Sequence, residues 1–97
     1  MGRVDGKVII VTGGATGIGR GISEVLAREG ARVVIANRNE ERGREAEAAI
    51  RAAGGEALFV QTDVAVEADC RRLVEEAVRA YGRLDALVNN AAGNFVV

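Results

Sequence analysis

The 97-residue sequence contains no histidine, proline or tryptophan, and it has one cysteine. Without histidine, no site can use imidazole as a metal ligand or as the base of a Ser-His-Asp triad. A single cysteine excludes an internal disulfide, which is compatible with a reducing cytosol, and the N-terminus carries no signal-peptide pattern. We therefore expect a cytoplasmic protein without a disulfide and without a metal site.

Charge imbalance and long hydrophobic runs are also missing. Thirteen basic and fourteen acidic residues give a net charge of −1, so there is no basic surface for nucleic acid or an anionic membrane. No run approaches the roughly 20 apolar residues of a membrane span. Apolar residues make up 48%, enough for the core of one small domain. We expect one domain over 1–97 that binds a small molecule, with no nucleic-acid or membrane partner.

The most informative stretch is 8–19, which reads VIIVTGGATGIG. An apolar run leads into a glycine-rich turn, and an amphipathic segment follows, which is the order strand, glycine loop, helix. Such a loop can hold a pyrophosphate at the helix N-terminus, where backbone N–H groups lack intrahelical partners. Gly13, Gly17 and Gly19 would permit the turn, the approach of the phosphate and close helix packing. The bare glycine cluster is also compatible with a tight turn that binds nothing.

Strands and helices alternate along the whole chain. The patterns predict strands over 7–11, 32–36, 57–61 and 84–88, and helices over 18–29, 40–53 and 67–81. This alternation favours a parallel sheet with right-handed crossovers and helices on both faces. We therefore predict an α/β fold with strand order 3-2-1-4, the N-terminal half of a Rossmann fold.

Each predicted helix has an apolar face, and these faces are expected to pack on the sheet. Cys70 falls on such a face, which favours a core position over a reactive thiol. The three predicted faces are Ile18, Ile22, Val25 and Leu26; Ala46, Ala49, Ile50 and Ala53; and Cys70, Leu73, Val74, Ala77, Val78 and Tyr81.

The residues after the second predicted strand bear on cofactor choice. Folds that prefer NAD place a carboxylate there, about 20 residues beyond the glycine loop, to bind the ribose 2′-hydroxyl. In this sequence the position is the neutral Asn37, and the next residue is Arg38, whose planar guanidinium suits a phosphate. The pair favours NADP(H) as the cofactor. The alternative is that Arg38 simply lies on a solvated loop.

Three segments together resemble the short-chain dehydrogenase/reductase family. They are Thr12-Gly13-x-x-x-Gly17-x-Gly19, the Asp63-Val64 pair, and 87–93, which reads LVNNAAG. The resemblance covers essentially the whole chain and implies that Asp63 and Val64 contact adenine and that Thr12 links the glycine loop to the Asn-Asn segment. The cofactor-binding residues that we predict are Gly13, Gly17, Ile18, Gly19, Asn37, Arg38, Asp63, Val64, Asn90, Ala91 and Gly93.

A narrower resemblance concerns the substrate. The segment 89–95, NNAAGNF, is similar to 2,4-dienoyl-CoA reductases, which implies that Asn94 and Phe95 line the site of an acyl-CoA thioester. Ala65 departs from the mammalian members, which carry arginine there, and Phe95 is equally compatible with a core position. The alternatives are a 3-oxoacyl-carrier-protein reductase, a sugar or alcohol dehydrogenase, or a nucleotide-binding module without catalysis.

The catalytic residues that the family resemblance implies, a Ser and a Tyr-x-x-x-Lys, do not occur in these 97 residues. The one tyrosine, Tyr81, is followed four residues later by Asp85, and we assign it no catalytic role. We therefore expect the chain to be the cofactor half of a longer enzyme of fatty acid metabolism, and the resemblance implies a homotetramer.

Overall fold

The computed structural model describes residues 4–90, in which strands and helices alternate. The elements are β1 (Val8–Thr12), α1 (Gly17–Arg28), β2 (Arg32–Asn37), α2 (Glu40–Ala52), β3 (Glu56–Gln61), α3 (Glu67–Tyr81) and β4 (Ala86–Asn89). Every predicted element is present, with bounds that differ from the prediction by at most two residues. No helix in this part of the chain is long and apolar enough to cross a membrane.

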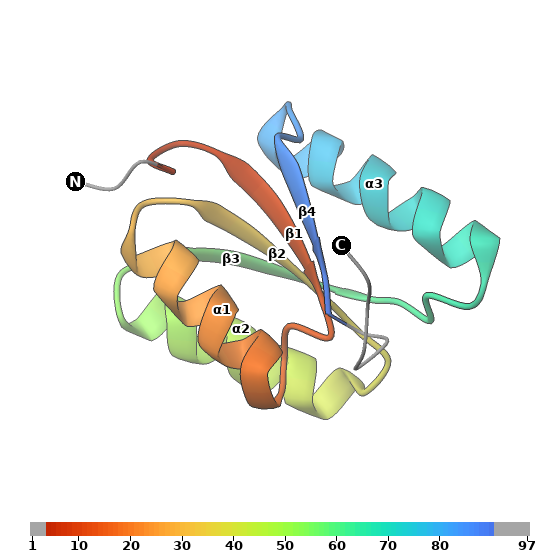
Figure 1. The fold of residues 1–97 in the computed structure, drawn as a ribbon, viewed down its shortest axis with the longest axis horizontal. Helices are drawn as coiled ribbons and strands as arrows, with labels where there is room; N and C mark the ends of the chain where they lie inside the picture. Colours follow the sequence, from red (N-terminus) through yellow and green to blue (C-terminus); the bar gives the residue numbers. More distant parts are fainter. Residues whose placement is uncertain (1–3, 91–97) are drawn as a thin grey trace.

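The four strands form one parallel sheet in the order β3-β2-β1-β4 (Figure 1). Helices α1 and α2 cover one face of the sheet, and α3 lies on the other. The predicted fold class and strand order are therefore confirmed. Because β1 lies inside the sheet, its buried residues pack against helices on both sides, which explains its continuous apolar sequence.

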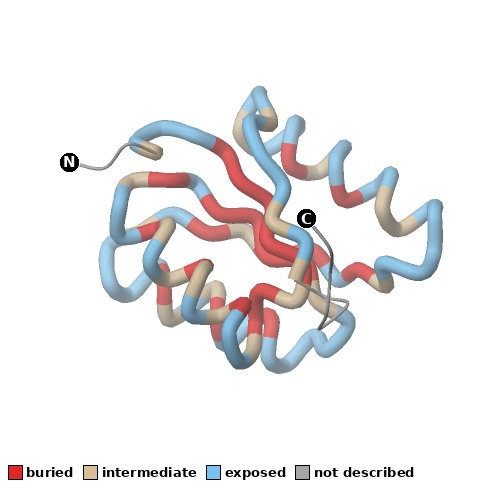
Figure 2. Tube along the Cα trace, viewed as in Figure 1, coloured by how far each residue is buried: buried red, intermediate tan, exposed pale blue. Residues whose placement is uncertain are grey.

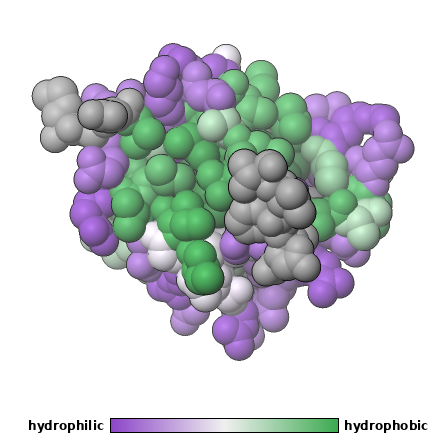
Figure 3. All heavy atoms as spheres, viewed as in Figure 1, coloured by the Kyte–Doolittle hydropathy of each residue, from purple (hydrophilic) through white to green (hydrophobic). Residues whose placement is uncertain are grey.

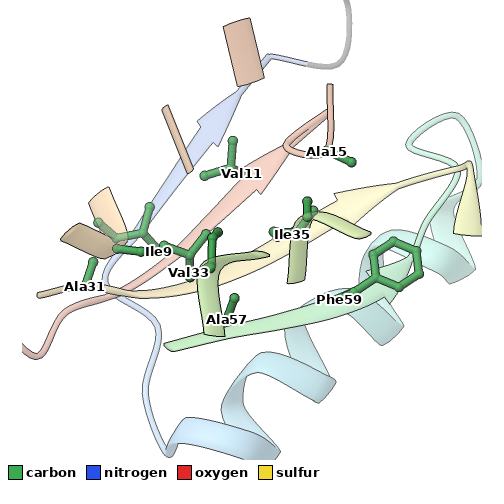
Figure 4. Packing of buried hydrophobic residues seen from close by; sticks show 11 residues of the cluster. Ile9, Val11, Ala15, Ala31, Val33, Ile35, Ala57 and Phe59 are labelled. Carbon is green, nitrogen blue, oxygen red and sulfur yellow. The ribbon is translucent and has the colours of Figure 1, made fainter. Parts of the chain in front are cut away.

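Alternate residues of the strands supply two separate cores. Ile9, Val33 and Ile35 point toward α1 and α2, where they meet Phe59 and other buried side chains (Figure 4). Their neighbours in sequence point the other way, toward Leu73 and Ala77 of α3. Figure 2 shows that burial is concentrated where the inner strands β1 and β2 pass between these layers.

Helix α2 approaches β3 closely because of a glycine. A Cβ at Gly43 would overlap the ring of Phe59, so only glycine fits at this crossing. Gly43, Ala46 and Ile50 are the buried residues of this helix. The predicted packing face was right for Ala46 and Ile50, but Ala53, which we expected on that face, is exposed.

The predicted packing face of α1 was right for Ile22 and Leu26, which are half-buried against the core, and wrong for Ile18 and Val25, which are 78% and 49% exposed. The buried residues of the helix are Gly19, Ser23 and Ala27. The small residues face the sheet because they let the helix backbone come close to β1 and β2. Larger apolar residues on the flanks are then left half-buried or exposed.

The predicted face of α3 is only partly buried. Leu73 and Ala77 pack against the sheet, but Val74 and Val78 are 43% and 44% exposed, and Leu87 of β4 is 58% exposed. Cys70 is half-buried and not a core residue; its Sγ lies 3.4 Å from the Val64 carbonyl oxygen. Figure 3 shows apolar atoms gathered on the side of the molecule where β4 and α3 lie.

The fourth strand begins at Ala86 and not at the predicted Leu84. The reason is Asp85, whose Oδ2 accepts a hydrogen bond from the Val8 backbone N–H at 2.8 Å. Arg83 donates to both carboxylate oxygens of Asp85, at 2.9 and 2.7 Å. These donors hold the pKa of Asp85 below its usual value, the Arg83 hydrogen bonds being the larger cause.

Candidate functional site: a cleft at the carboxyl ends of the strands

All four parallel strands end at the same edge of the sheet, and an open cleft lies there beside the ends of β1, β2 and β3. This is the position at which open α/β sheets bind ligands, outside the point where the strand order reverses. The cleft has a volume of about 860 Å³. Its lining residues come from the ends of β1, β2 and β3, the segments that follow them and the first turn of α2: Gly13, Thr16, Ala36, Asn37, Arg38, Asn39, Arg42, Thr62, Asp63, Val64 and Ala65.

The glycine loop after β1 needs backbone conformations that other residues rarely adopt. Gly13 has φ +65° and Gly17 has φ +55°. The Gly13 N–H donates to the Ala36 carbonyl at 2.7 Å, which ties the start of the loop to the end of β2. The loop is therefore held close to the residues that follow β2, on one side of the cleft.

Gly19, the last glycine of the motif, allows α1 to approach that loop. A Cβ at Gly19 would overlap the Gly13 carbonyl oxygen and would lie 2.6 Å from the Asn90 Nδ2 atom. Gly19 thus lies between the loop after β1 and the residue after β4. The expected role of the third glycine in close packing is consistent with this geometry.

Thr12 joins the ends of β1 and β4, as the sequence predicted. Its hydroxyl oxygen lies 3.1 Å from Asn89 Oδ1 and accepts a hydrogen bond from the Asn90 N–H at 2.8 Å. The side chain is 5% exposed. Thr12 therefore fixes the Asn-Asn segment beside the glycine loop without lining the cleft.

The loop after β2 is held by hydrogen bonds to the end of β3. The Thr62 N–H donates to the Asn37 carbonyl at 2.9 Å, and Gln61 Nε2 donates to the Arg38 carbonyl at 3.1 Å. Asn39 then caps α2, its Oδ1 accepting from the Arg42 N–H at 3.0 Å, as predicted. The backbone positions of Asn37, Arg38 and Arg42 are thus fixed, while the side chain of Arg38 is exposed at the cleft.

The loop after β3 presents Asp63 and Val64. The Asp63 N–H donates to Asp69 Oδ2 at 2.9 Å, and Asp63 Oδ1 accepts from the Ala65 N–H at 3.0 Å. Only one carboxylate oxygen is used in this turn, so the other can accept a hydrogen bond from a ligand. Val64 is 44% exposed, which leaves an apolar surface beside that carboxylate.

Five of the predicted cofactor residues line one cleft: Gly13, Asn37, Arg38, Asp63 and Val64. Three more, Gly17, Ile18 and Gly19, belong to the loop and helix start that border it, and Asn90 lies against Gly19. The predicted residues Ala91, Gly93, Asn94 and Phe95 lie outside the described residues. The assignment of all of these to a cofactor stays a prediction.

Tyr81 lies away from this cleft. The Arg32 guanidinium, at the start of β2, stands 5.7 Å from the centre of its ring. Burial raises the pKa of Tyr81, and the nearby Glu56 raises it further. A tyrosine that must lose its proton easily needs the opposite shift. That Tyr81 has no catalytic role stays a prediction.

Sequence reasoning overlooked three residues around the cleft. Ser23 is fully buried, and its hydroxyl lies 3.1 and 3.0 Å from the carbonyl oxygens of Gly14 and Gly19, so it fixes the loop from behind. Thr62 is 2% exposed and lines the cleft just before Asp63. Arg42 lines it from the first turn of α2. A serine at a helix packing position was the one signal in the sequence for Ser23.

Comparison with known proteins agrees with this architecture. A model of the short chain dehydrogenase family matches residues 7–96. An uncharacterized oxidoreductase of Methylorubrum extorquens is 48% identical over 92 residues, which are 94% of this chain and 37% of that protein. The cyclopentanol dehydrogenase of Comamonas testosteroni is 50% identical over 91 residues, 94% of this chain and 36% of that protein.

A solved structure shows the same likeness. The hydroxysteroid dehydrogenase of Escherichia coli superposes with a TM-score of 0.87 at 34% identity, over 90% of this chain and 37% of that one. The chain thus spans little more than a third of the length of the proteins it matches.

Proposed function

The chain belongs to the short-chain dehydrogenase family, and from that premise we propose that the whole protein is an NADP(H)-dependent oxidoreductase that interconverts a secondary alcohol and a ketone. The observation that carries the choice of NADP(H) is that the cleft-lining residues after the buried part of β2 are Asn37 and Arg38, neither of which is a carboxylate. The substrate class follows the relatives, whose names specify cyclopentanol and a hydroxysteroid.

The glycine loop supports binding of a dinucleotide. At Gly19 a Cβ would fill the space beside the Gly13 carbonyl, so the loop and helix start can come together only without side chains. Backbone at such a loop can approach a pyrophosphate, and the first N–H groups of α1 favour its negative charge. NADP(H), when bound, would supply or accept the hydride, while Gly13, Gly17, Ile18 and Gly19 would hold its pyrophosphate.

The end of β2 would distinguish the two cofactors by charge. A carboxylate at Asn37 would accept a hydrogen bond from the 2′-hydroxyl of NAD and repel the 2′-phosphate of NADP. Arg38 is exposed, and no ion pair involves it within residues 4–90. Its guanidinium can therefore pair with a phosphate without first breaking an existing contact.

The adenine would lie at the loop after β3. Asp63 can accept a hydrogen bond from the adenine amino group through its unused carboxylate oxygen, and Val64 can pack against the ring. Asn90, Ala91 and Gly93 would run beside the adenosine ribose. The proton transfer to the carbonyl would come from the Tyr-x-x-x-Lys that the family resemblance implies, which these 97 residues do not contain.

Paired titrations of NADPH and NADH with the whole protein test the cofactor assignment. A charged hydrogen bond of about 1.5–3 kcal/mol corresponds to roughly ten- to more than a hundredfold in affinity, so NADPH should bind more tightly by that factor. Arg38→Ala and Asn37→Asp should each reduce the preference. Arg28→Ala is the matched control, because Arg28 is also exposed and lacks an ion pair in the described residues, but it lies at the far end of α1. Tighter binding of NADH by the wild type would refute the assignment.

A second candidate substrate is an enoyl or dienoyl thioester of coenzyme A, favoured by the segment 89–95, NNAAGNF. Asn94 and Phe95 would then contact the substrate, and Phe95→Ala should raise KM for the thioester more than KM for NADPH. Assays with cyclic alcohols, sugars and a dienoyl thioester decide between the two candidates. Turnover of none of them would favour a nucleotide-binding module. A cytoplasmic homotetramer is part of the same proposal, and gel filtration tests the oligomeric state.

A further inference from the structure

We propose that Arg42, four residues after Arg38, is a second cation that binds the 2′-phosphate of the cofactor. The inference rests on the proposed use of NADP(H) and extends it to a residue that the sequence patterns did not single out. Arg42 lines the same cleft as Arg38 and Asn39. Two guanidinium groups from two consecutive structural elements would then face one dianionic group.

The backbone around the two arginines is already fixed without a ligand. Asn39, between them, accepts a hydrogen bond from the Arg42 N–H at 3.0 Å, which sets the start of α2. Gln61 donates to the Arg38 carbonyl at 3.1 Å from the end of β3. Only the two side chains have to be ordered when a phosphate binds, and this lowers the entropy lost on binding.

Arg38 and Arg42 differ in their ion pairing from other arginines nearby. Arg44, the next arginine of α2, lies 3.7 Å from both Glu40 and Glu47. Arg20 similarly contacts Glu24 and Glu45, at 3.0 and 3.4 Å. Within residues 4–90, neither Arg38 nor Arg42 makes an ion pair, so the positive charge of both remains available at the cleft.

The position of Arg42 in the helix is unfavourable for the free protein. It is the third residue of α2, in the first turn, where the helix macrodipole is positive and carboxylates are preferred. Glu40 and Glu41 satisfy that preference, and Glu40 is paired with Arg44 and does not line the cleft. An arginine at this place therefore lowers helix stability in the free protein, and a bound phosphate would offset that cost.

The proposed role of Arg42 predicts that its removal lowers cofactor affinity without lowering stability, which a purely structural arginine would not give. In the whole protein, Arg42→Gln should weaken NADPH binding by roughly tenfold, the lower end for a charged hydrogen bond. NADH affinity should be unchanged, because NADH lacks the 2′-phosphate. Without cofactor, the thermal midpoint should stay equal or rise. Arg42→Lys should restore part of the NADPH affinity, since it restores the charge without the planar donor pair.

Arg44→Gln is the matched control, because it removes the same kind of side chain two residues further along α2, where two glutamates already pair with it. It should lower the thermal midpoint slightly and leave the ratio of NADPH to NADH affinity unchanged. If the wild type and Arg38→Ala behave as proposed but Arg42→Gln keeps the full NADPH preference, the role of Arg42 is wrong and the cofactor assignment stands. If the wild type prefers NADH, both fail.

Discussion

The hydroxyl oxygen of Thr12 accepts a hydrogen bond from the backbone N–H of Asn90 at 2.8 Å, across 78 positions of sequence. It connects the strand that leads into the glycine loop to the strand that leads into the Asn-Asn segment. Because β1 and β4 are neighbours in the sheet, this contact lies at the end of their parallel ladder. The Thr12 side chain thus adds to the strand pairing that places the two segments beside each other.

Replacement of Thr12 by valine tests this connection. Valine has nearly the same shape but cannot accept the hydrogen bond, so the part-buried Asn90 N–H loses its partner. An unsatisfied group of this kind costs about 1–3 kcal/mol, and the free energy of unfolding of the whole protein should fall by that amount. Thr12→Ser keeps the hydroxyl and should stay within about 1 kcal/mol of the wild type. Equal stability of the valine and serine variants would show that the hydrogen bond is unimportant.

A glycine-to-alanine pair tests the geometry of the loop. Gly19→Ala places a Cβ against the Gly13 carbonyl, and the shift that this forces should lower the free energy of unfolding by about 1–3 kcal/mol. A loss of the same size in binding free energy would weaken cofactor affinity by roughly five- to more than a hundredfold. Gly21→Ala is the control, because Gly21 is on the same helix and a Cβ there would have no neighbouring atom within 4 Å. That variant should be more stable than the wild type by about 0.5–1 kcal/mol and bind cofactor normally. Isothermal titration and urea unfolding measure both effects.

Asp85 makes the stability of the sheet depend on pH. Its pKa is lowered in the folded protein by Arg83 and by the Val8 N–H, so its carboxylate stabilises the fold above the unfolded pKa of about 4. The contribution is lost as the pH falls through the lower pKa of the folded state. Asp85→Asn should therefore be less stable than the wild type at pH 7, and the difference should shrink at pH 3. Urea midpoints at the two pH values measure this.

The control for net charge is Glu75→Gln, which removes an exposed carboxylate from α3. A difference between wild type and Asp85→Asn that is the same at pH 3 and pH 7 would exclude the linkage. So would a Glu75→Gln protein with the same pH dependence as Asp85→Asn.

The 97-residue chain produced alone should have no oxidoreductase activity. It contains no Tyr-x-x-x-Lys, and its one tyrosine, Tyr81, lies away from the cleft. Val74, Val78 and Leu87 are large apolar residues that are exposed, and Figure 3 shows apolar atoms gathered on one side of the molecule. Such exposure should also make the chain self-associate, which light scattering can measure. Turnover of NADPH with any carbonyl or dienoyl substrate by the purified chain would contradict the prediction.

Strand order and element type could be predicted because they depend on local patterns and on general rules of chain connection. The apolar runs, the glycines at helix ends and the Asn39 cap are read directly from the sequence, and alternation of strands and helices then restricts the topology. Helix faces were predicted less well. For α1, small residues and not large ones were buried, since the closeness of two elements is a property of the assembled sheet.

In the candidate site, too, some residues could be predicted from the sequence and others could not. Gly13, Arg38 and Asp63 were found because each follows a predicted strand, and parallel strands end together. Arg42 was missed because its presence at the cleft depends on the direction in which α2 leaves the Asn39 cap, which the sequence does not specify. Ser23 was missed because the sequence does not distinguish a serine whose hydroxyl is buried beside two carbonyl groups from an exposed serine of a helix.

The order of the strands also determines when the site can be completed during synthesis. Of the four strands, β1 is translated first and its neighbour β2 second, but its other neighbour, β4, is translated last. A chain emerging from the ribosome has therefore already made β1, β2 and β3 while one edge of β1 is still without its partner. Three helices and two strands lie between β1 and β4, so the hydrogen bond between Thr12 and Asn90 has to wait until all of them and β4 have emerged. Of the segments that follow the four strands, the glycine loop is thus made first, but its link to β4 is made last.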